Sequence, residues 1–288
     1  MREFWLENSE GKLWDLTSNN LDNQDGSLLA DPDGLGIKTK IKSFEVENTI
    51  FVEEITTQTA VIDGKLYFKD YKHYQRFVEF VGNINTDKPL KLYYSIGEKL
   101  DKHWYKRVLI SELKKGEINK KTATLEVKVK FDCLSRWKQD QEISIEIGHT
   151  GGSLVYPYVY PYTYGGNNLA IDIDNTGNLP TSCIVKAEGH TDTPTFRLIQ
   201  NDEIIDQAKY NLVIPSGSHL IVDSAPDTQK ATLYTGTNEE NVYYTGEKDY
   251  TFSNFITIPT GVSTFVVSAL NTNFGKVTIS YSIQKELI

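Results

Sequence analysis

Histidine and cysteine are the residues of this sequence with the most obvious capacity for metal binding and catalysis. The histidines lie far apart, so no two have the close spacing of metal ligands on one helix or strand. They are His73, His103, His149, His190 and His219. The order His219, Asp223, Ser224 contains the residue types of a hydrolytic triad, but no Gly-X-Ser-X-Gly motif accompanies it. We therefore predict no catalytic residue, no metal site and no enzyme activity. The enzymatic alternative is a glycosidase whose two carboxylates are distant in sequence.

The run DIDNTGN at residues 172–178 matches the first half of an EF-hand calcium loop. Its twelfth position, where calcium needs a bidentate carboxylate, is Cys183. A strand that ends in an Asn-Thr-Gly-Asn turn is the better interpretation. The close glycines Gly34 and Gly36 precede no predicted helix, so they do not indicate a nucleotide-binding loop. We predict no cofactor.

Charge divides the chain into two parts. The 288 residues include 30 basic and 39 acidic side chains, a formal net charge of -9, which argues against a protein that coats nucleic acid. Residues 1–150 hold 23 basic and 25 acidic residues, whereas residues 151–288 hold 7 and 14. This shift predicts two domains, residues 1–150 and 151–288, that meet near Gly151-Gly152.

Neither a disulfide nor a membrane segment is expected. Cys133 and Cys183 fall on opposite sides of the predicted boundary, and a disulfide needs Cα atoms within about 7 Å, so we expect two free thiols. Residues 1–20 lack the pattern of a signal peptide, which favours synthesis in a cytoplasm. The uncharged residues 250–275 contain Pro259, Gly261 and many polar side chains, and predict strands rather than a membrane span.

The elements of the first part are mostly strands. The segments EFWLE and KLWDL flank NSEG, which predicts a starting hairpin. We interpret residues 17–36 as a loop, and Asp63-Gly64 as a two-residue hairpin turn. Spacings of three and four between apolar residues predict a helix near residues 70–82, begun by Asp70 and ended by Gly82. Alternating apolar residues predict further strands, among them TLEVKVKFDCL.

The second part reads as short strands separated by Gly, Pro, Asn and Asp, which is typical of an antiparallel sandwich. It opens with tyrosine at every second position, broken by two prolines that exclude a central strand. These tyrosines, for which we predict an interdomain or partner contact, include Tyr156, Tyr158, Tyr160 and Tyr162. The predicted fold class is mainly β.

The order of these signals resembles the distal tail proteins of long, flexible-tailed phages that infect Gram-positive bacteria. In the first part the resemblance rests on the aromatic hairpin, the Gly-Leu-Gly loop at residues 34–36, the helix YKHYQRFVEFV, the strand ending LYYS, and CLSRW with Trp137. In the second part it rests on VYPYTYGG, IDIDNTGNLPTSCIVKAEG, VIPSGSHLIVDS and SNFITIPTGVSTFVVSA.

The resemblance implies an N-terminal β-sandwich with one helix and a belt-like hairpin, then a galectin-like β-sandwich. It implies a structural virion protein at the tail tip, made in the bacterial cytoplasm, whose copies form a hexameric ring. The ring would join the tail tube protein to the tail-associated fibre or lysin and, in some phages, to receptor-binding proteins. Genome DNA would pass its lumen without specific binding. We expect Phe4, Trp5 and Trp14 at the ring interface, with the starting hairpin, residues 22–36 or a hairpin at Asp63-Gly64 as the arm.

The alternative function is a carbohydrate-binding module for the host surface, favoured by the aromatic second part. That part contains no tryptophan, since Trp5, Trp14, Trp104 and Trp137 all precede residue 150. This distribution lowers the support for a sugar platform.

Overall fold

The computed structural model describes residues 2–18, 20, 22–57, 60–82, 89–96, 103–146, 169–246, 252–270 and 276–288. The chain divides into two compact units, Met1–Gln139 with Lys285–Ile288 (unit 1) and Asp140–Gln284 (unit 2). The predicted boundary at Gly151-Gly152 falls outside the described residues and stays a prediction. Within the described part of the chain, no helix is long and apolar enough to cross a membrane.

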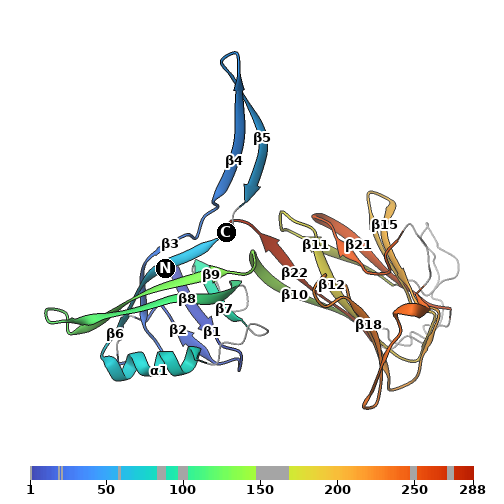
Figure 1. The fold of residues 1–288 in the computed structure, drawn as a ribbon. Coiled ribbons are helices and arrows are strands. Elements are labelled where there is room, and N and C mark those ends of the chain that lie inside the picture. The colour runs from blue at the N-terminus through green and yellow to red at the C-terminus, as the bar shows by residue number, and fades with distance from the viewer. Residues whose placement is uncertain are drawn as a thin grey trace, which may run out of the picture. The chain divides into compact units, whose positions relative to one another are not determined.

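Unit 1 consists of antiparallel strands and one α-helix (Figure 1). Its elements are β1 (Arg2–Glu7), β2 (Leu13–Asp15), β3 (Leu28–Asp33), β4 (Thr39–Val46), β5 (Thr49–Thr57), β6 (Val61–Phe68), α1 (Tyr71–Val81), β7 (Leu90–Ile96), β8 (Trp104–Asn119), β9 (Thr124–Cys133) and the start of β10 (Trp137–Glu146). The pairing runs β2-β1-β7-β8-β9-β6-β3. The first residues of the long strand β8 pair with β7 and the later ones with β9, so β8 joins two groups of strands.

Alternation of side chains builds the core of unit 1. In β9 the buried residues Leu125, Val127, Val129, Phe131 and Cys133 alternate with more exposed ones, because successive side chains of a strand point to opposite faces. The starting hairpin that the sequence predicts is confirmed, since β1 and β2 pair antiparallel.

Helix α1 begins and ends as its sequence predicts. The Asp70 carboxylate accepts a hydrogen bond from the His73 backbone N–H at 2.8 Å, and Gly82 is the C-cap. The buried face of the helix carries Phe77, whose ring lies 5.2 Å from Trp14 and 5.4 Å from Phe68. The helix therefore packs on β2 and β6 through aromatic side chains.

Two expectations about turns are wrong. Asp63-Gly64 is not a hairpin turn, because β6 runs straight through it and Gly64 lies opposite Val129 of β9. A Cβ on Gly64 would lie 2.9 Å from Leu29 Cδ1, so the glycine permits the close approach of β3. The loop expected over residues 17–36 contains a strand, β3, that pairs with β6.

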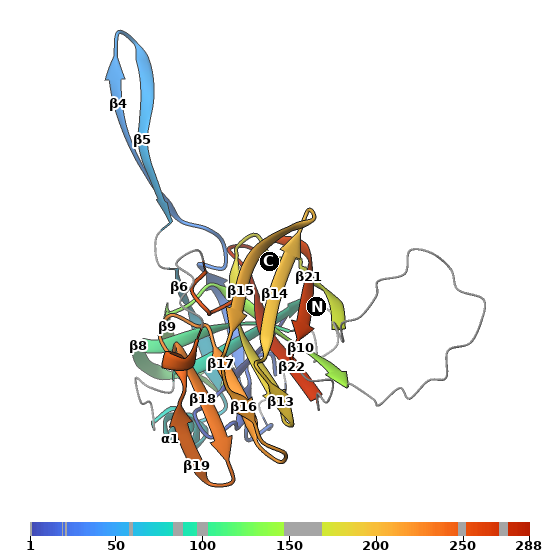
Figure 2. The same cartoon turned by 90° about the vertical axis from the view of Figure 1, so that its right-hand side faces the viewer.

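Unit 2 contains two main antiparallel sheets. Its strands are the end of β10, β11 (Leu169–Asn175), β12 (Thr181–Glu188), β13 (Thr191–Asp192), β14 (Thr195–Gln200), β15 (Glu203–Lys209), β16 (Val213–Ile214), β17 (His219–Asp223), β18 (Lys230–Thr235), β19 (Asn238–Asn241), β20 (Thr257–Ile258), β21 (Gly261–Ser268) and β22 (Lys276–Lys285), with a 3-10 turn at Tyr243–Thr245. One sheet has the order β19-β18-β17-β12-β22-β10, and the other β11-β21-β14-β15. Figure 2 shows β14, β15 and β21 side by side.

The core of unit 2 is made by the apolar faces of these strands. Val185 and Ile279 lie opposite each other in the first sheet, and Phe196 stacks on Phe265 at 6.2 Å in the second. All four side chains are buried. The predicted mainly β fold is confirmed, whereas the galectin-like character of the second part stays a prediction.

Candidate assembly arm and pocket

The hairpin formed by β4 and β5, which we call the arm, is the part of unit 1 with the least packing. Its strands pair with each other from Thr39↔Thr57 to Val46↔Thr49, and in the described residues neither pairs with another strand. Figure 1 draws it as a two-stranded ribbon with no other element along it. A lone hairpin is only marginally stable in water, so this arm needs a covering surface.

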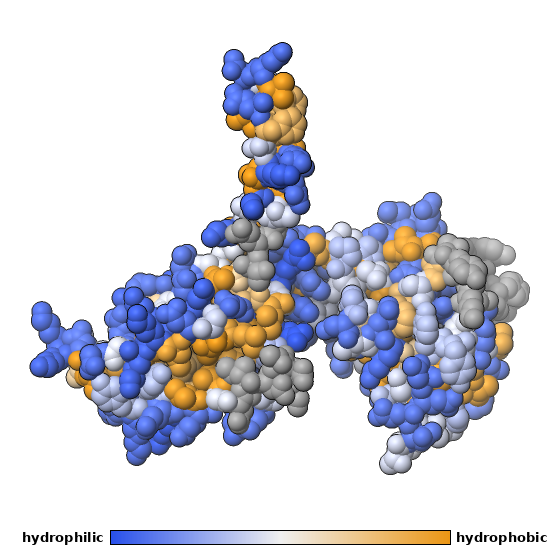
Figure 3. Space-filling model, viewed as in Figure 1, coloured by the Kyte–Doolittle hydropathy of each residue, from blue (hydrophilic) through white to orange (hydrophobic). Residues whose placement is uncertain are grey.

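Apolar side chains occupy both faces of the arm. On one face Ile41 lies opposite Ile55, and on the other Phe44 lies opposite Phe51 with ring centroids 5.5 Å apart. Ile50, near the tip, is 70% exposed and Ile55 is 63% exposed. Figure 3 shows hydrophobic and hydrophilic patches mixed along the arm. Exposed apolar clusters of this kind mark interaction surfaces.

Polar contacts do not account for the stability of the arm. Lys42 and Glu53 form an ion pair at 2.9 Å, but both side chains are more than half exposed. Such pairs contribute about 0 to 1 kcal/mol. The arm turns at Glu47 and Asn48, both with positive φ (48° and 63°), which is the geometry of a type I′ turn. The sequence analysis did not predict this turn, for which Asn48 is the local signal.

Two of the three aromatic residues expected at the ring interface lie in the core of unit 1. Phe4 and Trp14 are 4% and 2% exposed and belong to the core of unit 1, where Trp14 Nε1 donates to Ser27 Oγ at 3.0 Å. Trp5 is half-buried and stacks on His103 at 4.6 Å. Of these three residues, Trp5 alone offers a partly open ring to a partner.

The residues considered as a hydrolytic triad make structural contacts instead. His219 stacks on Tyr234 at 5.0 Å, and Asp223 accepts hydrogen bonds from Thr228 Oγ1 and the Ala225 backbone N–H. His219 and Asp223 are the two ends of β17, about 13 Å apart along a strand, so they do not form a triad with Ser224.

The run at residues 172–178, which resembles part of a calcium loop, has a structural role. Asn175 is buried, and its amide donates to the backbone oxygens of Leu179 and Pro259 at 3.0 Å each. The predicted strand end and turn are therefore confirmed. Cys183 is a buried free cysteine, and burial raises the pKa of its thiol to about 12. Tyr156, Tyr158, Tyr160 and Tyr162 lie outside the described residues, and their contact role stays a prediction.

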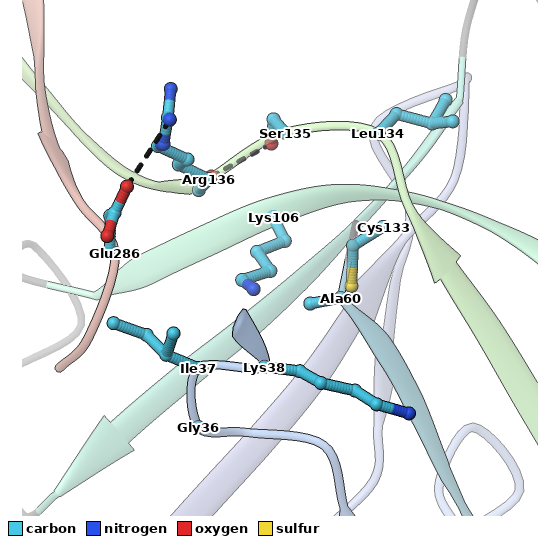
Figure 4. A pocket seen from close by; sticks show the side chains of 10 residues that line it. All are labelled: Gly36, Ile37, Lys38, Ala60, Lys106, Cys133, Leu134, Ser135, Arg136 and Glu286. Carbon is cyan, nitrogen blue, oxygen red and sulfur yellow. Dashed lines mark hydrogen bonds and ion pairs between the residues drawn. The ribbon is translucent and has the colours of Figure 1, made fainter. Parts of the chain in front are cut away.

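A cavity of about 280 Å³ lies at the base of the arm. Residues 36–38, which lead into β4, form one wall, and the turn after β9 forms another (Figure 4). Lys106, from β8, is 3% exposed and reaches into this space, whereas Lys38 extends away and Arg136 turns toward Glu286 at 3.3 Å. Burial lowers the pKa of Lys106.

Comparison with known proteins agrees with this architecture. The family model described as distal tail protein, N-terminal domain, matches residues 3–134. No curated protein matches the chain in sequence.

Solved structures share the fold over the full length. A chain of the phage P2 baseplate in its activated conformation with Ca has a TM-score of 0.63 at 13% identity, with 100% of both chains covered. The SPP1 Dit (gp 19.1) protein, described as a paradigm of the hub adsorption apparatus in Gram-positive infecting phages, has a TM-score of 0.58 at 12% identity. That match covers 97% of this chain and 98% of the SPP1 protein. At such identities these structures establish the fold, and residues 3–134 belong to the family described as distal tail protein, N-terminal domain.

Proposed function

We propose that this protein forms a closed ring, six copies around, at the tip of the phage tail. The ring joins the tail tube protein to the tail-associated fibre or lysin and offers positions for receptor-binding proteins. A ring requires a heterologous contact, in which one patch of each copy meets a different patch of the next. The protein acts without catalysis, after synthesis in the host cytoplasm.

The arm is the observation that carries this proposal. It exposes apolar side chains on both faces, and in the described residues neither strand pairs outside the hairpin. A neighbouring copy that received the arm would bury these side chains at about 25 cal/mol per Å² of apolar area. The two faces would thus be covered in the assembly and exposed in the free subunit.

Substitutions on the two faces of the arm test this role. Phe44→Ser combined with Ile50→Ser removes an exposed apolar side chain from each face. We expect the wild type to associate as its concentration rises in sedimentation velocity runs, and the double variant to stay monomeric with an unchanged unfolding midpoint. Lys40→Ser, an exposed polar position on the same arm, is the matched control and should associate like the wild type. Equal association of the double variant would contradict the role of the arm.

The acidic balance of the chain supports the passage of DNA through the ring. A lumen lined by acidic or neutral side chains would not retain phosphates, whereas a basic lumen would. A ring structure with a strongly basic bore would contradict this part of the proposal.

A further inference from the structure

Lys106 occupies a position where the fold calls for an apolar side chain. In β8 it lies between the buried Tyr105 and the half-buried Arg107, opposite Leu92 of β7, and is followed two residues later by the fully buried Val108. Lys106 itself is only 3% exposed. A lysine is almost never buried to this degree unless it is paired.

No acceptor for this ammonium is found among the described residues. Lys106 Nζ lies 4.9 Å above the ring of Trp137, and no carboxylate of the described chain lies within ion-pair distance of it. The neighbouring Trp137 Nε1 is also buried without an acceptor there. The one acidic residue of the cavity wall, Glu286, is paired with Arg136. A cation with so little exposure keeps little hydration, so an anion from outside would stabilise the site.

The cavity has the size and charge for a carboxylate. Its volume is about 280 Å³, and among the described residues its walls carry Lys38, Lys106 and Arg136 against one acid, Glu286. Lys106 is the one of these three cations that points into the space (Figure 4). An ammonium donates strong, short hydrogen bonds to a carboxylate.

The tip of the arm supplies a carboxylate at an unusual position. Glu47 is exposed and has φ 48°, in a turn where Asn-Gly or Asp-Gly is the stable choice. A glutamate is disfavoured there, so the local backbone does not explain this residue. The tip and the base of the arm are thus complementary in charge, and β4 separates them by about 26 Å at 3.3 Å per residue.

We propose that the cavity around Lys106 is a receptor for the Glu47 carboxylate of a second copy, so that the tip of each arm enters the base of the next arm. This proposal rests on the proposed ring function, because it requires the arm to reach a neighbour. A contact between the tip of one arm and the base of the next is heterologous, because it joins two different surfaces. Repeated in one direction, such a contact can close a ring. The ammonium of Lys106 is then compensated in the assembly and not in the free subunit.

Three variants test the pairing. Glu47→Asn removes the carboxylate and gives the turn a preferred residue, so the arm itself is not weakened. Glu45→Gln removes the neighbouring arm acid and is the matched control. Lys106→Met removes the ammonium but keeps a long apolar side chain. By sedimentation equilibrium we expect Glu47→Asn and Lys106→Met each to weaken association about 30-fold or more, as for truncation of one partner of a buried pair.

The stability of Lys106→Met gives a second readout. Replacing an unpaired buried cation with an apolar residue should leave the free subunit as stable as the wild type or more stable, while association weakens. If the role of Lys106 were merely structural, Lys106→Met would instead lower the stability of the subunit and leave its association constant unchanged.

The outcomes separate this inference from the ring itself. If the wild type and Glu47→Asn associate equally, while Phe44→Ser with Ile50→Ser does not associate, the pocket proposal is overturned and the arm keeps its role. If Lys106→Met weakens association but Glu47→Asn does not, Glu47 is not the occupant and the proposal fails. A wild type that never associates overturns the proposed function as well. A non-additive double variant of Glu47→Asn and Lys106→Met supports direct contact.

Discussion

Gly34 and Gly36 bound the loop before the arm, and a Cβ atom would have a different effect at each. At Gly34 the backbone φ is +85°, and a Cβ would lie 1.8 Å from the Val61 carbonyl oxygen. At Gly36 nothing lies within 4 Å of such a Cβ. We expect Gly34→Ala to lower the free energy of unfolding by about 2 kcal/mol or more, and Gly36→Ala to change it by less than about 0.5 kcal/mol.

Urea denaturation followed by tryptophan fluorescence measures this difference in unit 1, because Trp5, Trp14, Trp104 and Trp137 all belong to that unit. Equal stability of the two alanine variants would contradict the packing of the loop against β6.

His73 gives unit 1 a pH dependence. Burial against Trp14 and Phe68 lowers the pKa of His73 below its ordinary value of 6.5, although Asp70 opposes the shift. The unfolded chain therefore binds the proton more readily. The contribution of His73 is fully present above about pH 6.5 and is lost as the pH falls below it.

We expect the fluorescence-detected free energy of unfolding to fall between pH 7 and pH 5, and His73→Gln to flatten that slope. His190→Gln, an exposed histidine of unit 2, is the control. An unchanged slope in His73→Gln would show that other groups cause the dependence.

Residue types alone could not separate core from interface in the starting hairpin. Phe4 and Trp14 are large aromatic residues, and such residues are equally typical of a protein's own core and of an interface with a partner. The structure buries both under α1 and the neighbouring strands. Lys106 was not predicted as a site residue because a lysine among other charged residues is expected to be exposed. The sequence gives no sign that this strand position faces inward.

At the scale of elements, the arm should be separable from the rest of unit 1. Replacing residues 39–57 with a short Gly-Ser linker removes strands that pair only with each other in the described structure. We expect the unfolding midpoint to stay within about 2 °C of the wild type and concentration-dependent association to disappear. Differential scanning calorimetry and sedimentation velocity measure the two effects. A large loss of stability would mean that the arm packs on its own unit.

Local signals predicted some elements and failed for others. Asp70 and Gly82 mark the ends of α1 because helix caps depend on neighbouring backbone groups. Asp63-Gly64 has the composition of a hairpin turn, yet its glycine serves the close approach of β3, a tertiary reason that the local sequence does not contain. The true turn, Glu47-Asn48, contains no glycine, so its composition gives only a weak signal of a hairpin turn.

The whole molecule is two β units linked by two strands. β10 leads out of unit 1 and β22 returns to it, so the last four residues belong to unit 1. The charge shift near residue 150 predicted two parts of different composition, but no composition signal could show that the C-terminus rejoins the first unit. Arg136 and Glu286, which form an ion pair at 3.3 Å within unit 1, are widely separated in sequence.

The central claim is that copies of this chain close into a ring through the arm. The most direct measurement is the mass of the largest species by light scattering on a sizing column, over a concentration series, with negative-stain images of that species. We expect a mass six times that of the subunit and rings with a central hole, both absent when residues 39–57 are replaced. A mass that is the same for the wild type and the arm-replaced protein at every concentration would contradict it.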